Sequence, residues 1–172
     1  MNNILITGLP GTGKTTLFMK LVDQLRPMNP AGFYTDEIRQ HGVRKGFRLT
    51  DLHGETMILS HTDIESRYRV GKYGVDIAGF NAYLDRCCLL NNNSGLVMID
   101  EIGKMECLSD KFKEIVGYLL ETPTIFIATI ALKGRGFIAD IKIRDDVKIY
   151  EITYKNRDFL IDNILKDIGM RS

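Results

Sequence analysis

Apolar residues along the chain fall into two kinds of run, and the alternation of these runs predicts a protein of the α/β class. Short, mainly apolar runs predict buried strands at residues 3–7, 96–99, 124–130 and 147–152. Longer runs with apolar residues at helical spacing predict helices at 14–26, at 77–87, after Ser109, and from about 157 onward. Strands and helices in this order are typical of a parallel sheet covered on both faces.

Residues that cap or stop helices mark where these helices should begin and end. The first predicted helix stops at Pro27 and the last at Gly169. Ser109 has the side chain of a helix cap and is expected to start the third helix. The second helix is expected to end in the run Asn91, Asn92 and Asn93.

A second pattern, of three strands in direct succession, predicts an antiparallel insert. Residues 32–39, 43–50 and 56–59 read as strands, separated by the turns 40–42 and 51–54. Parallel strands need a crossover of a dozen residues or more, so strands this close must pair as hairpins. We find no linker, repeat or low-complexity tract and therefore expect one domain spanning residues 1–172.

Composition and charge fit an ordinary globular chain. The sequence has 172 residues, of which 44% are hydrophobic and 26% charged, and a net charge of +1. This charge provides no global field to recruit nucleic acid or an anionic membrane. No apolar run approaches membrane-spanning length, and we see no signal peptide. Cys87, Cys88 and Cys107 match no zinc spacing, which favours reduced thiols in a cytoplasm.

The strongest chemical signal lies between the first predicted strand and the first predicted helix. Residues 8–15 match G-x-x-x-x-G-K-[ST], the phosphate-binding loop. Glycines let backbone N–H groups face an anion, and the following helix adds its N-terminal donors. Lys14 would reach the β- and γ-phosphates, and the Thr15 hydroxyl would ligate Mg²⁺. A dinucleotide fingerprint starting at Gly11 would need glycine where the chain has Thr16, and it would leave Lys14 unexplained.

The loop residues predicted to bind nucleotide are Gly8, Leu9, Pro10, Gly11, Thr12, Gly13, Lys14, Thr15 and Thr16.

A second chemical signal is the pair of carboxylates that ends the apolar strand 96–99. Asp100 is predicted to hold Mg²⁺ together with Thr15, usually through water in this class of fold. Glu101 would lie near the γ-phosphate and orient or deprotonate the attacking water. Residues 100–103 also fit the D-x-x-G string of GTP-binding switch proteins. However, the segment after residue 130 lacks the [NT]-K-x-D pattern that reads guanine, so we expect loose base selectivity.

Basic residues gather in two early segments and after residue 130. The early clusters are Arg39, His41, Arg44, Lys45 and Arg48, and Arg67, Tyr68, Arg69, Lys72 and Tyr73. Cations interleaved with aromatics bind single-stranded nucleic acid in some proteins, although a solvated hairpin face is the more ordinary interpretation. Later cations that could stabilise γ-phosphate charge are Lys133, Arg135, Arg144 and Arg157. Among these, we assign the catalytic role to Arg144, which lies in a lid-like stretch after the strand 124–130.

These motifs together resemble one family across almost the whole chain. The segments that carry the resemblance are residues 4–17, 32–47, 69–76, 98–106 and 156–158. They are similar to the small P-loop nucleoside-triphosphatases of thermophilic bacteria and archaea, which have a human relative called the cancer-related nucleoside-triphosphatase. The resemblance implies a three-layer RecA-like fold and places Ile102 and Gly103, with Asp100 and Glu101, along the nucleotide site. Asn81 and Cys107 depart from the family pattern outside the phosphate machinery.

The sequence therefore predicts a Mg²⁺-dependent nucleoside-triphosphatase with Glu101, Lys14 and Arg144 as catalytic residues. Its expected substrates are ATP, GTP, CTP and UTP, which are hydrolysed to nucleoside diphosphate and phosphate. We expect a monomer that needs no membrane, and nucleic acid is not favoured as a partner. Two alternatives stay open: a small-molecule or nucleotide kinase with the same loop, and an ATPase stimulated by nucleic acid.

Overall fold

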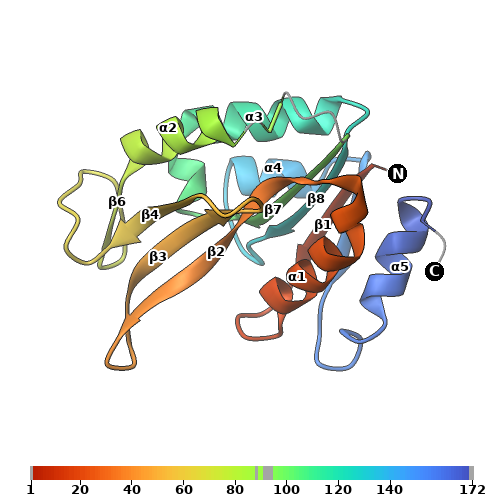
Figure 1. Ribbon diagram of the computed structural model, residues 1–172, viewed down its shortest axis with the longest axis horizontal. Coiled ribbons are helices and arrows are strands. Elements are labelled where there is room, and N and C mark those ends of the chain that lie inside the picture. The colour runs from red at the N-terminus through yellow and green to blue at the C-terminus, as the bar shows by residue number, and fades with distance from the viewer. Residues whose placement is uncertain (1, 88, 91–94, 171–172) are drawn as a thin grey trace.

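A nine-stranded sheet forms the centre of the computed structural model, which describes residues 2–87, 89–90 and 95–170 (Figure 1). The strand order is β5-β6-β4-β3-β2-β7-β8-β1-β9. The strands are β1 (Asn3–Thr7), β2 (Ala31–Gln40), β3 (Val43–Asp51), β4 (Thr56–His61), β5 (Arg69–Val70), β6 (Tyr73–Val75), β7 (Leu96–Ile102), β8 (Ile125–Ile130) and β9 (Val147–Glu151).

One half of the sheet is parallel, as the alternation of strands and helices predicts. β1 pairs in parallel with β8 on one side and with β9 on the other, and β7 pairs in parallel with β8 and β2. The carboxyl ends of these strands therefore meet at one edge of the sheet. Loops at that edge are where ligands bind in open α/β sheets.

The other half of the sheet is the predicted antiparallel insert, and it is larger than predicted. β2, β3 and β4 pair as successive hairpins, and a further hairpin of β5 and β6 adds to β4. β2 belongs to both halves, because residues 31–33 pair in parallel with residues 97–99 of β7 and residues 33–40 pair with β3. The insert is thus continuous with the parallel half and is not a separate layer.

Helices cover both faces of the sheet, which confirms the three-layer α/β fold (Figure 1). α1 (Lys14–Leu25) and α5 (Leu160–Asp167) pack on one face; α2 (Ile77–Arg86), α3 (Asp110–Glu121) and the short α4 (Phe137–Lys142) pack on the other. The described residues also include two 3₁₀ turns, η1 (Arg26–Met28) and η2 (Glu106–Leu108). Among the described residues, no helix has the length and apolar character needed to cross a membrane.

The core beneath α2 and α3 is aromatic. The Phe33 ring of β2 lies 6.2 Å from that of Phe80 and 6.4 Å from that of Phe112, and all three side chains are fully buried. Ser109 caps α3 as predicted, accepting a hydrogen bond from the Phe112 N–H. α2 ends at Arg86, and the asparagines 91–93 predicted to end it lie outside the described residues.

Candidate active site

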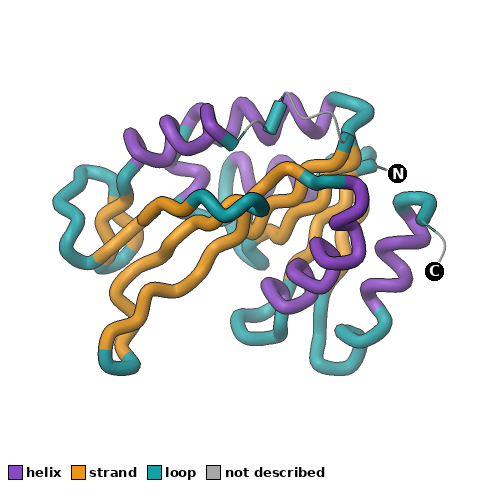
Figure 2. The backbone as a smooth tube through the Cα atoms, viewed as in Figure 1, coloured by secondary structure: helices purple, strands orange, loops and turns teal. Residues whose placement is uncertain are grey.

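Residues 8–13 join β1 to α1 at the carboxyl edge of the parallel strands (Figure 2). Gly11 and Gly13 have φ angles of 78° and 99°, a left-handed conformation that side chains other than glycine rarely adopt. The Lys14 ammonium donates hydrogen bonds to the carbonyl oxygens of Gly8, at 3.0 Å, and Leu9, at 3.3 Å. The structure therefore has left-handed glycines in the loop, and it places the Lys14 ammonium against the carbonyl groups of the same loop.

The remaining loop residues have supporting positions. Thr12 is buried, and its hydroxyl donates to the Leu9 carbonyl at 2.8 Å, which ties the turn together. Leu9 and Pro10 are exposed at the top of the loop. Thr15 and Thr16 lie in the first turn of α1 and are exposed.

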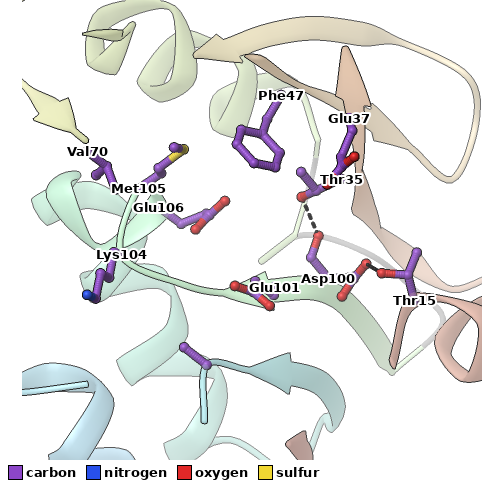
Figure 3. A pocket seen from close by; sticks show the side chains of 11 residues that line it. Thr15, Thr35, Glu37, Phe47, Val70, Asp100, Glu101, Lys104, Met105 and Glu106 are labelled. Atoms are coloured by element: carbon purple, nitrogen blue, oxygen red, sulfur yellow. Dashed lines mark hydrogen bonds between the residues drawn. The ribbon is translucent and has the colours of Figure 1, made fainter. Parts of the chain in front are cut away.

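Asp100 connects the phosphate-binding loop to the middle of the sheet. Its Oδ2 accepts a hydrogen bond from the Thr15 hydroxyl at 2.7 Å, and its Oδ1 accepts a short one from Thr129 on β8. Its backbone carbonyl accepts from the Thr35 hydroxyl at 2.7 Å (Figure 3). Burial raises the pKa of Asp100, although both threonine hydrogen bonds and the charge of Lys14 act in the opposite direction. The structure thus brings Thr15 and Asp100 together, as predicted for two ligands of one cation.

Glu101 lies one residue further along β7, with its carboxylate directed into a cavity (Figure 3). Burial raises its pKa, and the negative charge of Asp100 raises it further, whereas Lys14 lowers it. A carboxylate with a raised pKa holds a proton more readily, which suits a group that takes a proton from water. Gly103 is close by: a Cβ there would lie 2.7 Å from both a Glu101 oxygen and a Glu106 oxygen.

Glu106 is a second carboxyl on the same cavity and was not predicted as a site residue. It lies in η2 and is only 4% exposed. Burial, followed by the charge of Glu101, raises the pKa of Glu106 to about 8. At neutral pH this side chain is mainly a carboxylic acid, so it can donate a hydrogen bond as well as accept one.

The cavity has a volume of about 380 Å³ and opens next to Thr15 and Glu101. The insert supplies one wall, with Thr35 and Glu37 from β2 and Phe47 from β3 (Figure 3). The opposite wall consists of Val70 from β5 and the residues that follow β7, which include Lys104, Met105 and Glu106. The antiparallel insert therefore has a direct structural role in the site. Ile102 itself is fully buried and pairs with Ile130 of β8, so it holds the strand in place.

Arg144 is the one predicted catalytic residue that the structure places elsewhere. It lies just before β9, whose first residue, Val147, pairs with Asn3 at the start of β1. This is the amino edge of the parallel strands, opposite to the phosphate-binding loop. The Arg144 guanidinium pairs there with Glu121 at 2.7 Å and Asp146 at 2.6 Å. The prediction of Arg144 as a γ-phosphate cation was wrong, because chain order after β8 does not reveal to which edge of the sheet the chain has returned.

Three arginines of the first early basic cluster form ion pairs within the insert. Glu37 pairs with Arg39 and with Arg44, the latter at 2.7 Å, and Arg48 lies 3.6 Å from Asp36. The Arg44 guanidinium also stacks 5.2 Å from the centre of the Phe47 ring. In the second cluster, cations cover the rings of two tyrosines. These contacts agree with a solvated hairpin face, the interpretation that the sequence favours, and nucleic-acid binding stays an open alternative.

Thr129 and Thr35 also belong to the site and were not predicted from the sequence. A signal was available for Thr129, which is a polar residue near the carboxyl end of an otherwise apolar strand and is fully buried. Buried hydroxyls require partners, so its position next to β7 indicates a bond to Asp100. The sequence gives no comparable signal for Glu106.

The fold and the loop define an α/β protein of the P-loop NTPase-like class. The family model described as NTPase matches residues 3–165. The nucleoside-triphosphatase THEP1 of Thermotoga sp. (strain RQ2) is 45% identical over 94% of this chain and 92% of its own length. The human cancer-related nucleoside-triphosphatase is 36% identical over 95% of this chain and 94% of its own length.

Solved structures agree with the sequence relatives. The crystal structure of THEP1 from Aquifex aeolicus superposes with a TM-score of 0.85 at 33% identity, covering 97% of this chain and 99% of that one. The solution structure of the human nucleoside triphosphatase gives a TM-score of 0.82 at 35% identity, with 98% of each chain covered. The chain belongs to this NTPase family and is an enzyme of the nucleoside-triphosphatase type.

Proposed function

We propose that the chain hydrolyses nucleoside triphosphates to nucleoside diphosphate and phosphate, with Mg²⁺ as cofactor and with little selectivity for the base. The observation that carries this proposal is the convergence of Thr15, Asp100 and Glu101 at one end of the phosphate-binding loop. Two of these groups suit a hard cation and the third suits an attacking water. Hydrolysis needs all three functions within a few ångströms of each other.

The oxygen donors of the site fit Mg²⁺. A threonine hydroxyl and a carboxylate share a hydrogen bond here, and hard oxygens are the ligands that Mg²⁺ prefers. No group of three or more His, Cys, Asp or Glu side chains in the described part of the chain is arranged to hold a metal. This fits Mg²⁺ too, because the cation usually takes most of its ligands from water and substrate phosphates. When bound, Mg²⁺ would neutralise charge on the β- and γ-phosphates.

The groups of the site have separate roles in the proposed reaction. Backbone N–H groups of the loop and the Lys14 ammonium hold the phosphates and offset their charge. Glu101 orients a water and accepts its proton as the water oxygen attacks the γ-phosphorus. The bond between the γ-phosphorus and the β–γ bridging oxygen breaks, and the diphosphate leaves with the electron pair. Thr129 holds Asp100 in the orientation that faces Thr15.

Phosphate release from ATP in the absence of any added acceptor tests the proposal. Glu101→Gln keeps the shape of the side chain but removes its basicity, so turnover should fall by roughly 10²- to 10⁴-fold while ATP binding persists. Glu114→Gln, an exposed carboxylate on α3, is the matched control and should keep the parent rate. EDTA should abolish hydrolysis by the parent.

The same assay separates the proposal from the kinase alternative. A kinase would release little phosphate until a hydroxyl-bearing acceptor is added, whereas a hydrolase needs only water. Full activity in excess EDTA, or equal losses of binding and turnover in Glu101→Gln, would contradict the assigned roles.

A further inference from the structure

A second cavity, of about 270 Å³, lies beside the phosphate-binding loop. Its lining comes from the first turns of α1 and from the loop between β9 and α5. The lining residues are Gly13, Thr16, Leu17, Lys20, Arg157 and Asp158. Gly13 and Thr16 are predicted from the sequence to bind phosphate, and Arg157 is a candidate cation for the γ-phosphate.

The strand order shows which end of a bound nucleotide this cavity would meet. β7, which carries Asp100 and Glu101, lies on one side of β1 with β8 between them, and β9 lies directly on the other side. Thr15 faces Asp100, whereas the neighbouring Thr16 lines the second cavity. A row of phosphates along the loop with its terminal phosphate near Glu101 would therefore leave its other end, where the nucleoside is attached, at the β9 side.

The β9–α5 loop is fixed relative to the phosphate-binding loop. The Ile152 N–H donates to the Thr7 carbonyl at 2.7 Å, and a Cβ on Gly8 would lie 2.6 Å from the Ile152 carbonyl oxygen. Asn156 braces the turn: its Oδ1 accepts from the Thr153 N–H at 2.7 Å, and its amide donates to a β9 carbonyl at 2.9 Å. The cavity wall is therefore built into the fold.

The β9–α5 loop presents an aromatic ring and a guanidinium group to solvent. Tyr154 is 67% exposed, and its hydroxyl lies 3.5 Å from the Gly11 carbonyl of the phosphate-binding loop. The Arg157 side chain is half exposed, and its Nε lies 3.9 Å from the Asp158 carboxylate, a loose pairing. Guanidinium planes stack on nucleobases, and stacking tolerates any base because every base has a π-face.

We propose that this cavity is the nucleoside cleft of the enzyme, where Arg157 stacks on the base beside Lys20 and Thr16. The inference rests on the proposed function, since it presumes a nucleotide on the loop. In this arrangement Arg157 acts at the opposite end of the nucleotide from the γ-phosphate. Recognition by stacking also accounts for the weak base selectivity in the proposed function.

Binding of nucleoside diphosphates, compared with inorganic pyrophosphate, tests the cleft without relying on hydrolysis. Calorimetric titrations with Mg²⁺ would use ADP, GDP, CDP, UDP and pyrophosphate on the parent, on Arg157→Ala and on Arg26→Ala. Arg26 is an exposed arginine at the opposite end of α1 from the phosphate-binding loop and serves as the matched control. Arg157→Ala should raise the Kd of all four diphosphates by roughly 5- to 100-fold and that of pyrophosphate by less than 2-fold. Arg26→Ala should change neither.

Two results would contradict the assignment of this cavity as the nucleoside cleft. If Arg157→Ala weakens pyrophosphate as much as the diphosphates, Arg157 contacts phosphate and not the nucleoside. If no Kd changes, the nucleoside lies elsewhere. Neither result depends on turnover, so a parent enzyme that binds diphosphates but releases no phosphate from ATP would contradict the proposed function while leaving the cleft intact.

Discussion

The buried carboxyl of Glu106 should make the stability of the nucleotide-free protein fall as the pH rises. Its pKa is 4.5 in an unfolded chain and about 8 in the fold, where burial and the charge of Glu101 oppose ionisation. Between these two values the folded state holds a proton that the unfolded state has released. Since the folded state then binds more protons, the free energy of unfolding decreases with rising pH.

The size of the effect follows from the same two pKa values. Each pH unit in that window lowers the free energy of unfolding by at most about 1.4 kcal/mol. From pH 5.5 to pH 7.5 Glu106 should therefore contribute a loss of up to about 2.7 kcal/mol. Above pH 8 both states are ionised, and the contribution levels off.

Urea unfolding of the parent and of Glu106→Gln at several pH values between 5.5 and 8.5 measures this contribution. Asp100 and Glu101 also have raised pKa values, so both proteins should lose stability with pH. Only the difference between their slopes belongs to Glu106, and the glutamine variant should have the shallower slope. Parallel slopes would refute the reasoning, because they would mean that the carboxyl titrates alike in the folded and unfolded states.

Three further predictions concern individual side chains of the fold. Thr129→Val removes a buried donor to Asp100 and should destabilise the protein by about 1–3 kcal/mol in urea unfolding. Half-saturation of activity should also need roughly 10- to 100-fold more Mg²⁺. An unchanged dependence of activity on Mg²⁺ would show that Thr129 has no influence on the cation. In Gly103→Ala the added methyl group would press against the carboxyl groups of Glu101 and Glu106. Turnover should fall by roughly 10- to 100-fold with little change in ATP binding. A normal rate in steady-state assays would show that these carboxyl groups can move aside at no cost to catalysis. Arg144→Ala should leave turnover unchanged and lower the free energy of unfolding by about 1 kcal/mol or less, since the ion pairs of Arg144 are exposed to solvent. Slower single-turnover hydrolysis by this variant would show that Arg144 is a catalytic group after all.

Local features of the chain were predictable because neighbouring residues determine them. The phosphate-binding loop depends on glycines at fixed spacing, and the Ser109 cap depends on a side chain three residues from its donor. The hairpins of the insert followed from strand lengths and turns. In contrast, α4 was missed because its six residues are too short for a helical period to stand out. The β5–β6 hairpin was missed because its two strands are shorter still.

Features that depend on tertiary packing were harder to predict from the sequence. The run 96–99 was predicted as a strand, but β7 continues to Ile102 because that residue pairs with Ile130. Glu106 enters the site only because the chain after β7 turns back onto the cavity. Arg144 was misplaced for the same reason, since its position depends on where α4 returns the chain. Residue type predicts chemistry, whereas tertiary structure decides which chemical groups meet.

The double pairing of β2 makes strand register decisive for this enzyme. Thr35 and Glu37 point into the cavity, whereas Tyr34 packs toward the core on the α1 side of the sheet. A slip of one residue against β7 would exchange these two sets of side chains between the faces of the sheet. The cavity would then lose Glu37 and the Thr35 hydroxyl that holds the Asp100 carbonyl, even with every strand still paired. A misregistered molecule could thus have normal secondary structure and no activity, so circular dichroism alone would not reveal whether the active site had formed.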